Sequence, residues 1–405
     1  MAAASLADGG DLDLADEYAG RRDELRFAES RAGGRQLVSD GRRIDGRLVE
    51  PHGIGFPLLI APAYALGGAT LAVVLLAALA ALAFVLAAAL ARRVVPDPWA
   101  TWSALLVGLS PPALALSTAV LPALTAGALL AGAILCALHV RDRPLMRYAY
   151  GGAAMLAALP WLHPWLLVPA APVAALLARW TARRGRRLVA IGTLEVQLAS
   201  LVFYVSLNER LYDGFTPLAV AQQPVTGAGS PGDYAGRVER LASLWLDRDV
   251  GLLRWVPVLA LAFLGAWLLW RSRRERLGRL VAEHRDAEHA AFIALAACAG
   301  QVAVAAFLVP RLDGPWFPGT PLAAALPCAV PLVAWGLRRA PRTGWVLGAL
   351  TLAASLWLVL TASWAPPDSD APWGPLVVGF PGGAAVALGV VAGVVWWRAR
   401  RGLRL

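Results

Sequence analysis

Long apolar runs separated by short arginine-rich segments are the feature that most constrains this chain. The first run, from Phe56 to Leu90, contains no charged side chain. A helix of about 20 apolar residues crosses the hydrocarbon core of a bilayer, so runs of this kind predict membrane-spanning helices. Hydrophobic residues make up 58% of the 405 residues, above the roughly 45–50% of soluble domains. We therefore predict an all-α, polytopic helical membrane protein.

Breaks within the runs set the number of spans. Pro57, Pro62 and the Gly67-Gly68 pair interrupt the first run, which predicts a surface helix over 56–66 before the first span. The segment around Pro160 and Pro164 is either two short spans or one re-entrant hairpin. Residues 1–55 are expected to form a polar arm, and 56–405 one membrane domain with about eleven spans. The spans are predicted at 69–91, 101–119, 121–139, 148–161, 164–180, 188–207, 252–270, 288–309, 319–337, 343–364 and 374–397.

Arginine residues indicate the orientation. The net charge is +10, and arginine provides every basic side chain other than histidine. The arginines cluster in alternate loops, beginning with Arg92-Arg93, and such loops are typically cytoplasmic. This distribution explains the basic charge without a nucleic-acid partner. It predicts a polar arm outside and a cytoplasmic C-terminus. Because the arm has no signal-peptide pattern, we expect an upstream helix to be missing, which would bring the total to about twelve.

Acidic residues in the arm are the first candidate for chemistry. Asp8, Asp11 and Asp13 lie within a few residues of one another. Clustered carboxylates bind a divalent cation or act as a general base. The alternative is a solvated acidic turn. We predict no other cofactor, and whether a metal is required stays open.

Two histidines are expected on the same outer face. His52 precedes the surface helix, at the depth of a lipid phosphate, where it could donate a hydrogen bond to a phosphate oxygen. The alternative is a tight Gly/Pro turn with an incidental histidine. His163 lies at the 160–164 hairpin, where it either contacts substrate or caps a helix.

A third outer segment and a single mid-span acid complete the candidates. Asp247 and Arg248 precede the seventh predicted span, and Arg254 lies at its start; arginine pairs well with anionic substrates. Interfacial anchoring of a helix end is the alternative. Glu195 lies within span 188–207, where an ionisable residue is a functional candidate by default.

Soluble-type chemistry lacks sequence support. The chain has no Walker A, GxSxG or HExxH motif. Its cysteines, Cys136, Cys298 and Cys328, lie in apolar runs without metal-ligand spacing and are interpreted as buried thiols.

An ordered series of these stretches resembles the bacterial GT-C glycosyltransferases, the group that includes protein O-mannosyltransferases and lipid A aminoarabinose transferases. The resemblance extends from the N-terminus to about residue 260, and the later spans match only in hydropathy. The matching stretches are 5–14, 52–64, 109–112 with 117–122, 159–164 and 247–257.

The resemblance implies a GT-C bundle in a bacterial plasma membrane. Its first outer loop would carry the catalytic carboxylate, and sugar would move from a polyprenyl-phosphate donor to a glycan, lipid or protein acceptor of the cell envelope. The acidic pair that these relatives place directly after their first span is missing, and their Tyr-Pro-Glu pattern reads Leu121-Pro122-Ala123 here. A truncated, non-catalytic relative and a transporter or flippase of lipid-linked sugars therefore remain alternatives.

Overall fold

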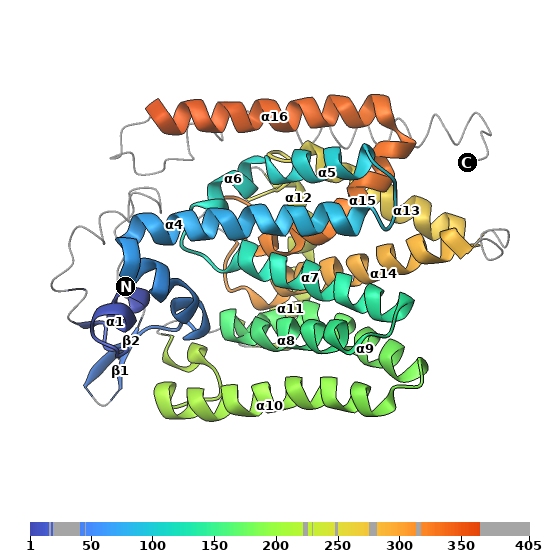
Figure 1. Ribbon diagram of the computed structural model, residues 1–405. Helices are drawn as coiled ribbons and strands as arrows, with labels where there is room; N and C mark the ends of the chain where they lie inside the picture. The colour runs from blue at the N-terminus through green and yellow to red at the C-terminus, as the bar shows by residue number, and fades with distance from the viewer. Residues whose placement is uncertain are drawn as a thin grey trace.

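The apolar runs form helices in the computed structural model, which describes residues 1–15, 18, 41–44, 46–221, 226–228, 230–247, 250–274, 282–312 and 317–364. The helices lie side by side with their axes broadly aligned (Figure 1). Among the described residues, seven helices are long and apolar enough to cross a membrane, and a bent pair provides an eighth candidate. The predicted helical membrane class is confirmed. The predicted span 374–397 lies outside the described residues.

Each of the ten predicted spans within the described residues coincides, at least in part, with one or two helices. Their bounds are α4 Gly55–Ala91, α5 Trp99–Gly108, α6 Pro111–Ser117, α7 Ala123–Asp142, α8 Met146–Leu162, α9 Leu167–Arg183 and α10 Arg187–Tyr212, then α13 Ala260–Arg274, α14 Ala282–Ala303, α15 Leu326–Arg339 and α16 Pro341–Trp364. Short helical turns precede or extend several of them, namely η1 Pro164–Leu166, η4 Pro257–Leu259, η7 Thr320–Ala325 and the π-helical turn η6 Val304–Leu308.

Two interruptions follow the local sequence. Helix α4 is broken at Gly67 and at Gly68, which has a φ of 61°, a conformation that glycine adopts without penalty. This is the break that the sequence predicts. The predicted span 101–119 is instead bent by 63° between α5 and α6, because Pro111 and Pro112 follow the extended Ser110 and start a new helix.

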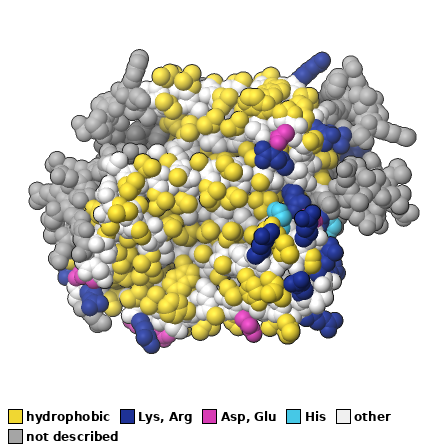
Figure 2. Space-filling view, viewed as in Figure 1, with side chains coloured by type: hydrophobic (Ala, Val, Ile, Leu, Met, Phe, Trp, Pro, Cys, Tyr) yellow, Lys and Arg dark blue, Asp and Glu magenta, His cyan; other side chains and the backbone are white. Residues whose placement is uncertain are grey.

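Close packing relies on glycine. A Cβ atom built on Gly265 of α13 would lie 2.1 Å from the Leu332 carbonyl oxygen of α15, and one on Gly336 would lie 2.3 Å from that of Leu261. Small residues let membrane helices approach in this way. The outward faces remain apolar: Val85 is 63% exposed and Leu198 61%. Hydrophobic side chains also cover the middle of the face drawn in Figure 2.

The two sets of loops lie at opposite ends of the bundle. One end, here the Arg end, carries the loops 92–97, 141–147, 183–187 and 338–342 (Figures 1 and 2). The other, here the arm end, carries the described part of residues 1–55 and the loops at 117–122 and 163. The arm contains helix α1 (Ala2–Asp8) and an antiparallel hairpin of β1 (Arg42–Ile44) and β2 (Arg47–Val49).

Candidate functional site at the arm end

The acidic arm is an ordered turn held by its own carboxylates. Ser5 Oγ donates to Asp11 Oδ1 at 2.8 Å, and the same oxygen accepts the backbone N–H of Asp13 at 3.2 Å. Asp8 is the last residue of α1, and its side chain lies outside the described residues. These hydrogen bonds therefore fix the backbone of this stretch at the arm end of the bundle.

Asp13 joins the turn to the hairpin. Its Oδ1 accepts the backbone N–H of Leu48 at 2.9 Å and that of Ala15 at 3.1 Å, while the Leu14 N–H donates to the Leu48 carbonyl at 3.0 Å. These backbone donors, led by Leu48, lower the pKa of Asp13 because they stabilise the ionised form, and Arg43 and Arg47 add to the effect. A carboxylate held in this way is a weak base.

The hairpin is packed onto the end of α10. Val49, Tyr212 and Val220 form a small buried cluster, in which Val220 belongs to the short turn η2 (Pro217–Val220). Tyr18 Oη also donates a short hydrogen bond to Glu50 Oε1. The arm is thus fixed to the helical bundle directly before His52.

His52 has a fixed backbone and an exposed side chain. Its N–H donates to the Glu50 carbonyl at 2.8 Å, and Tyr212 Oη donates to the His52 carbonyl at 3.0 Å. Cβ atoms on Gly53 and Gly55 would lie 2.9 Å and 2.6 Å from the Trp161 carbonyl oxygen. Only glycine permits this approach, so the His52 turn rests directly on the end of α8.

His163 lies between α8 and η1, outside both helices. Its Nδ1 accepts the Trp165 N–H at 3.4 Å, and the two rings make an edge contact with centroids 5.2 Å apart. Burial lowers its pKa, and the nearby His52 lowers it further, to about 4. His163 is therefore neutral at pH 7. Stretches 52–57 and 159–164, more than 100 residues apart, meet here.

The third predicted segment forms a turn against helix α12 (Arg240–Leu246). The amides of Leu252 and Leu253 donate to the Leu244 and Trp245 carbonyls, at 2.9 Å and 3.2 Å. Asp247 is exposed and accepts the Val250 N–H at 3.2 Å, whereas Arg254 is only 5% exposed. Arg248 lies outside the described residues.

An apolar groove adjoins this turn. It has a volume of about 320 Å³, and its walls come from α12, α13, α14, η7 and α15. Its lining includes Trp245, Leu252, Phe263, Val302 and Phe307. Such a surface suits a hydrocarbon chain.

The remaining predicted features are readily placed. Glu195 lies on the exposed face of α10. Cys328 is buried, and Cys136 and Cys298 are partly buried. Within the described part of the chain, no group of three or more His, Cys, Asp or Glu side chains is placed to hold a metal ion. The divalent-cation site therefore stays a prediction.

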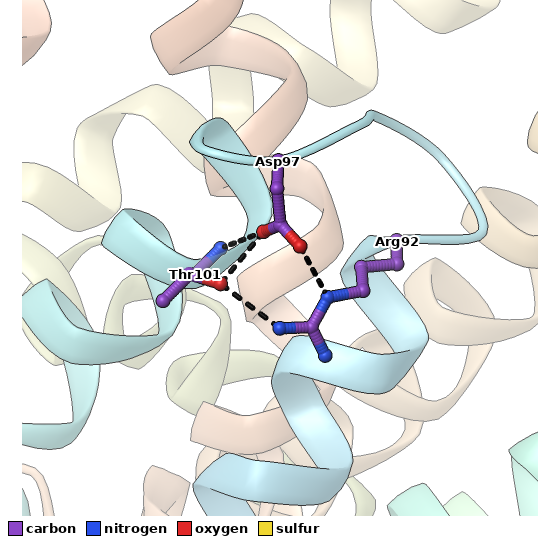
Figure 3. A network of polar contacts seen from close by, with 3 residues as sticks. All are labelled: Arg92, Asp97 and Thr101. Carbon is purple, nitrogen blue, oxygen red and sulfur yellow. Dashed lines mark hydrogen bonds and ion pairs between the residues drawn. The ribbon is translucent and has the colours of Figure 1, made fainter.

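The Arg end carries its own polar network, in which Asp97 caps α5. The Asp97 carboxylate accepts the Thr101 N–H at 3.1 Å and the Thr101 hydroxyl at 2.6 Å, and pairs with Arg92 at 2.6 Å (Figure 3). The Thr101 hydroxyl and then the Arg92 guanidinium lower the pKa of Asp97. These contacts fix the α4–α5 connection, and we assign them a structural role.

Sequence reasoning missed Tyr212 and Gln301. Tyr212 holds the His52 carbonyl, although it ends a long apolar helix as an ordinary interfacial tyrosine would. Gln301 lines a second cavity beside His163. Its one sequence signal is that it is an amide inside an otherwise apolar run.

Comparison with known proteins gives little further information. No protein-family model and no curated protein matches the chain. The chain is similar in structure to the oligosaccharyltransferase of Archaeoglobus fulgidus, crystallised with zinc and sulfate, with a TM-score of 0.40 and 14% identity. The alignment covers 87% of this chain and 48% of that one, so the chain spans about half its length. A likeness this distant does not assign a family.

Proposed function

We propose that the chain has a GT-C-type bundle and is a membrane glycosyltransferase, acting in a bacterial plasma membrane with its arm end outside. It transfers a sugar from a polyprenyl-phosphate donor to a hydroxyl of a glycan, lipid or protein acceptor in the cell envelope. The observation that carries the proposal is the seating of the His52 turn on Trp161, beside His163. Two of the stretches that carry the family resemblance, 52–64 and 159–164, thereby lie against each other.

The proposed transfer reaction requires a base, a group that stabilises the leaving phosphate and a binding surface for the lipid. The bond between the anomeric carbon and the phosphate oxygen breaks, and a bond from that carbon to the acceptor oxygen forms. The acceptor hydroxyl loses its proton to a base, and polyprenyl phosphate leaves with the bonding electrons. His52, with its exposed ring, would donate to the phosphate, and the apolar groove would hold the isoprenoid chain. Arg248 and Arg254 would stabilise the phosphate charge, and Asp8, Asp11 and Asp13 are the proposed base or cation ligands.

A non-catalytic relative that binds lipid-linked sugar is the second candidate. It is favoured by the arm contacts, because the Asp11 and Asp13 carboxylates already accept hydrogen bonds from Ser5, Leu48 and the arm backbone. Carboxylates engaged in this way hold the loop in shape, which leaves less basicity for proton removal.

One experiment separates the two candidates. The full chain in lipid nanodiscs would be incubated with undecaprenyl-phosphate sugars radiolabelled in the sugar and with a bacterial cell-envelope extract as the source of acceptor hydroxyls. Transfer of label from the lipid to the extract would be measured together with lipid binding. We expect turnover that falls at least 10-fold in His52→Ala and is retained in His139→Ala, a control at the Arg end. Binding without turnover would favour the non-catalytic relative, and absence of both would refute the two candidates together.

A further inference from the structure

A second cavity opens at the arm end, and α14 and η7 contribute to its wall as they do to that of the groove. It has a volume of about 260 Å³ and lies between the start of α7, the His163 connection, the end of α14 and η7. Most of its wall is apolar, and its polar side chains are those of His163, Trp165, Gln301 and Thr320. We refer to it as the Gln301 cavity.

Gln301 presents a buried acceptor. The side chain is 6% exposed, and its Nε2 donates to the Pro321 carbonyl at 2.7 Å. Because a carbonyl only accepts hydrogen bonds, the amide nitrogen must face Pro321, which fixes the position of Oε1. That oxygen accepts no hydrogen bond from the described residues. An unsatisfied buried acceptor costs about 1–3 kcal/mol; because Gln301 lines the cavity, a bound group that donates to this oxygen would remove that cost.

The helix carrying Gln301 has an unusual end. The π-helical turn Val304–Leu308 follows directly, and Val304 and Val309 line the cavity. Such turns occur frequently at functional sites. Arg237 Nη1 donates to the Phe307 carbonyl at 2.5 Å, and Arg240 donates to the Val309 carbonyl at 2.8 Å. These contacts fix the backbone of the cavity wall that follows Gln301.

The charges identify the class of ligand. No described residue that lines the cavity carries a charge, since His163 is neutral at pH 7. Because His163 Nδ1 accepts the Trp165 N–H, the neutral ring carries its proton on Nε2 and can donate there. A hydroxyl both donates and accepts, which matches this pair, whereas a phosphate would lack a cation.

We propose that the Gln301 cavity binds the neutral sugar unit of the lipid-linked donor, with one hydroxyl donating to Gln301 and accepting from His163. The identity of the carrier rests on the proposed function. The volume lies just below the ~300 Å³ at which pockets for drug-sized ligands begin, which suits one sugar unit. The sugar would thus be selected by α14 and the His163 connection, apart from the acidic arm.

The test compares lipids that differ only in the sugar. Binding of farnesyl phosphate and of its mannosyl, glucosyl and arabinosyl forms would be measured on the full chain in nanodiscs. We expect at least one sugar-bearing form to bind 10-fold more tightly than farnesyl phosphate. Gln301→Leu should abolish this preference and leave farnesyl phosphate binding unchanged. Gln197→Leu, the same replacement within α10, should retain it.

Two results would overturn the inference: equal binding of all four lipids to the wild type, or a preference that survives Gln301→Leu. If that variant does not fold, Ala123→Phe, which fills the same cavity, is judged in the same way. Because the readout is binding, a chain without turnover still supports or overturns the inference, so failure here is distinguishable from failure of the proposed transfer reaction.

Discussion

Asp13 connects the pH of the medium to the order of the arm. Its pKa is lowered from 3.8 in the folded arm, so its ionised form contributes stability above pH 3.8, and that stability is lost as the pH falls below this value. We predict that amide exchange at Leu48 accelerates below about pH 3.8, after correction for intrinsic rates. Asp13→Asn keeps the acceptor oxygen without the titration and should remove this pH dependence. Unchanged pH dependence in the variant would contradict the assignment.

Folding favours the neutral form of His163, whereas it favours the charged form of Asp13. The pKa of His163 falls from 6.5 to about 4 on folding. Its contribution to the stability of the folded protein is therefore present above pH 6.5 and is lost as the pH falls toward 4. We predict that thermal unfolding in detergent shifts several degrees lower between pH 7 and pH 5. His163→Asn retains a capping oxygen for the Trp165 N–H and should show a smaller shift. An equal shift in both proteins would assign the effect to other groups.

Single residues differ in how far the sequence reveals them. His52 and His163 stand out because glycine and proline surround them, and the structure brings their two stretches, 52–57 and 159–164, together. The approach of these two stretches depends on Gly53 and Gly55 fitting against Trp161, a tertiary fit that no local pattern encodes. Gln301 becomes informative only when Pro321 is seen to occupy its amide nitrogen.

Contacts between helices depend on particular glycines. The sequence shows that the helices contain glycine, but it does not show which glycines lie where two helices touch. Since a Cβ on Gly265 would lie 2.1 Å from the Leu332 carbonyl oxygen, Gly265→Ala must separate α13 from α15. We predict a loss of about 1–3 kcal/mol, measured as a lower denaturant midpoint. Gly151→Ala in α8 meets only Cys136 Sγ at 4.0 Å and should be neutral or stabilising. Equal effects in both variants would refute the close-packing argument.

Helix positions follow from hydropathy, whereas their shapes do not. The Gly67-Gly68 break is a backbone property of glycine and was predictable. The predicted span 252–270 begins later, at the turn η4, because residues 250–256 fold back on α12. The bend between α5 and α6 also escapes a hydropathy window, which averages across Ser110 and two prolines. The resulting bent segment has the form of a broken span or of a re-entrant loop.

At the scale of the molecule, charge segregates along the bundle axis. Alternate loops reach the same end, so the arginine-rich connections gather opposite the arm (Figure 2). Salt bridges from Arg93 and Arg141 to Asp142 leave a net positive charge there. Positive loops are retained in the cytoplasm, which favours an external arm end and a site accessible to donors and acceptors outside the membrane.

Cysteine labelling in intact cells tests this orientation. Gly236→Cys, in the connection between the predicted spans 188–207 and 252–270, has open space around it, with no atom within 4 Å of the added Cβ, and Arg186→Cys is its counterpart at the Arg end. An impermeant maleimide should label the first in intact cells and the second only after permeabilisation. The native chain, whose cysteines are buried or partly buried, serves as the background control. The reverse pattern would place His52 and the Gln301 cavity in the cytoplasm and exclude transfer on the outer face, while leaving the fold and the binding inference intact.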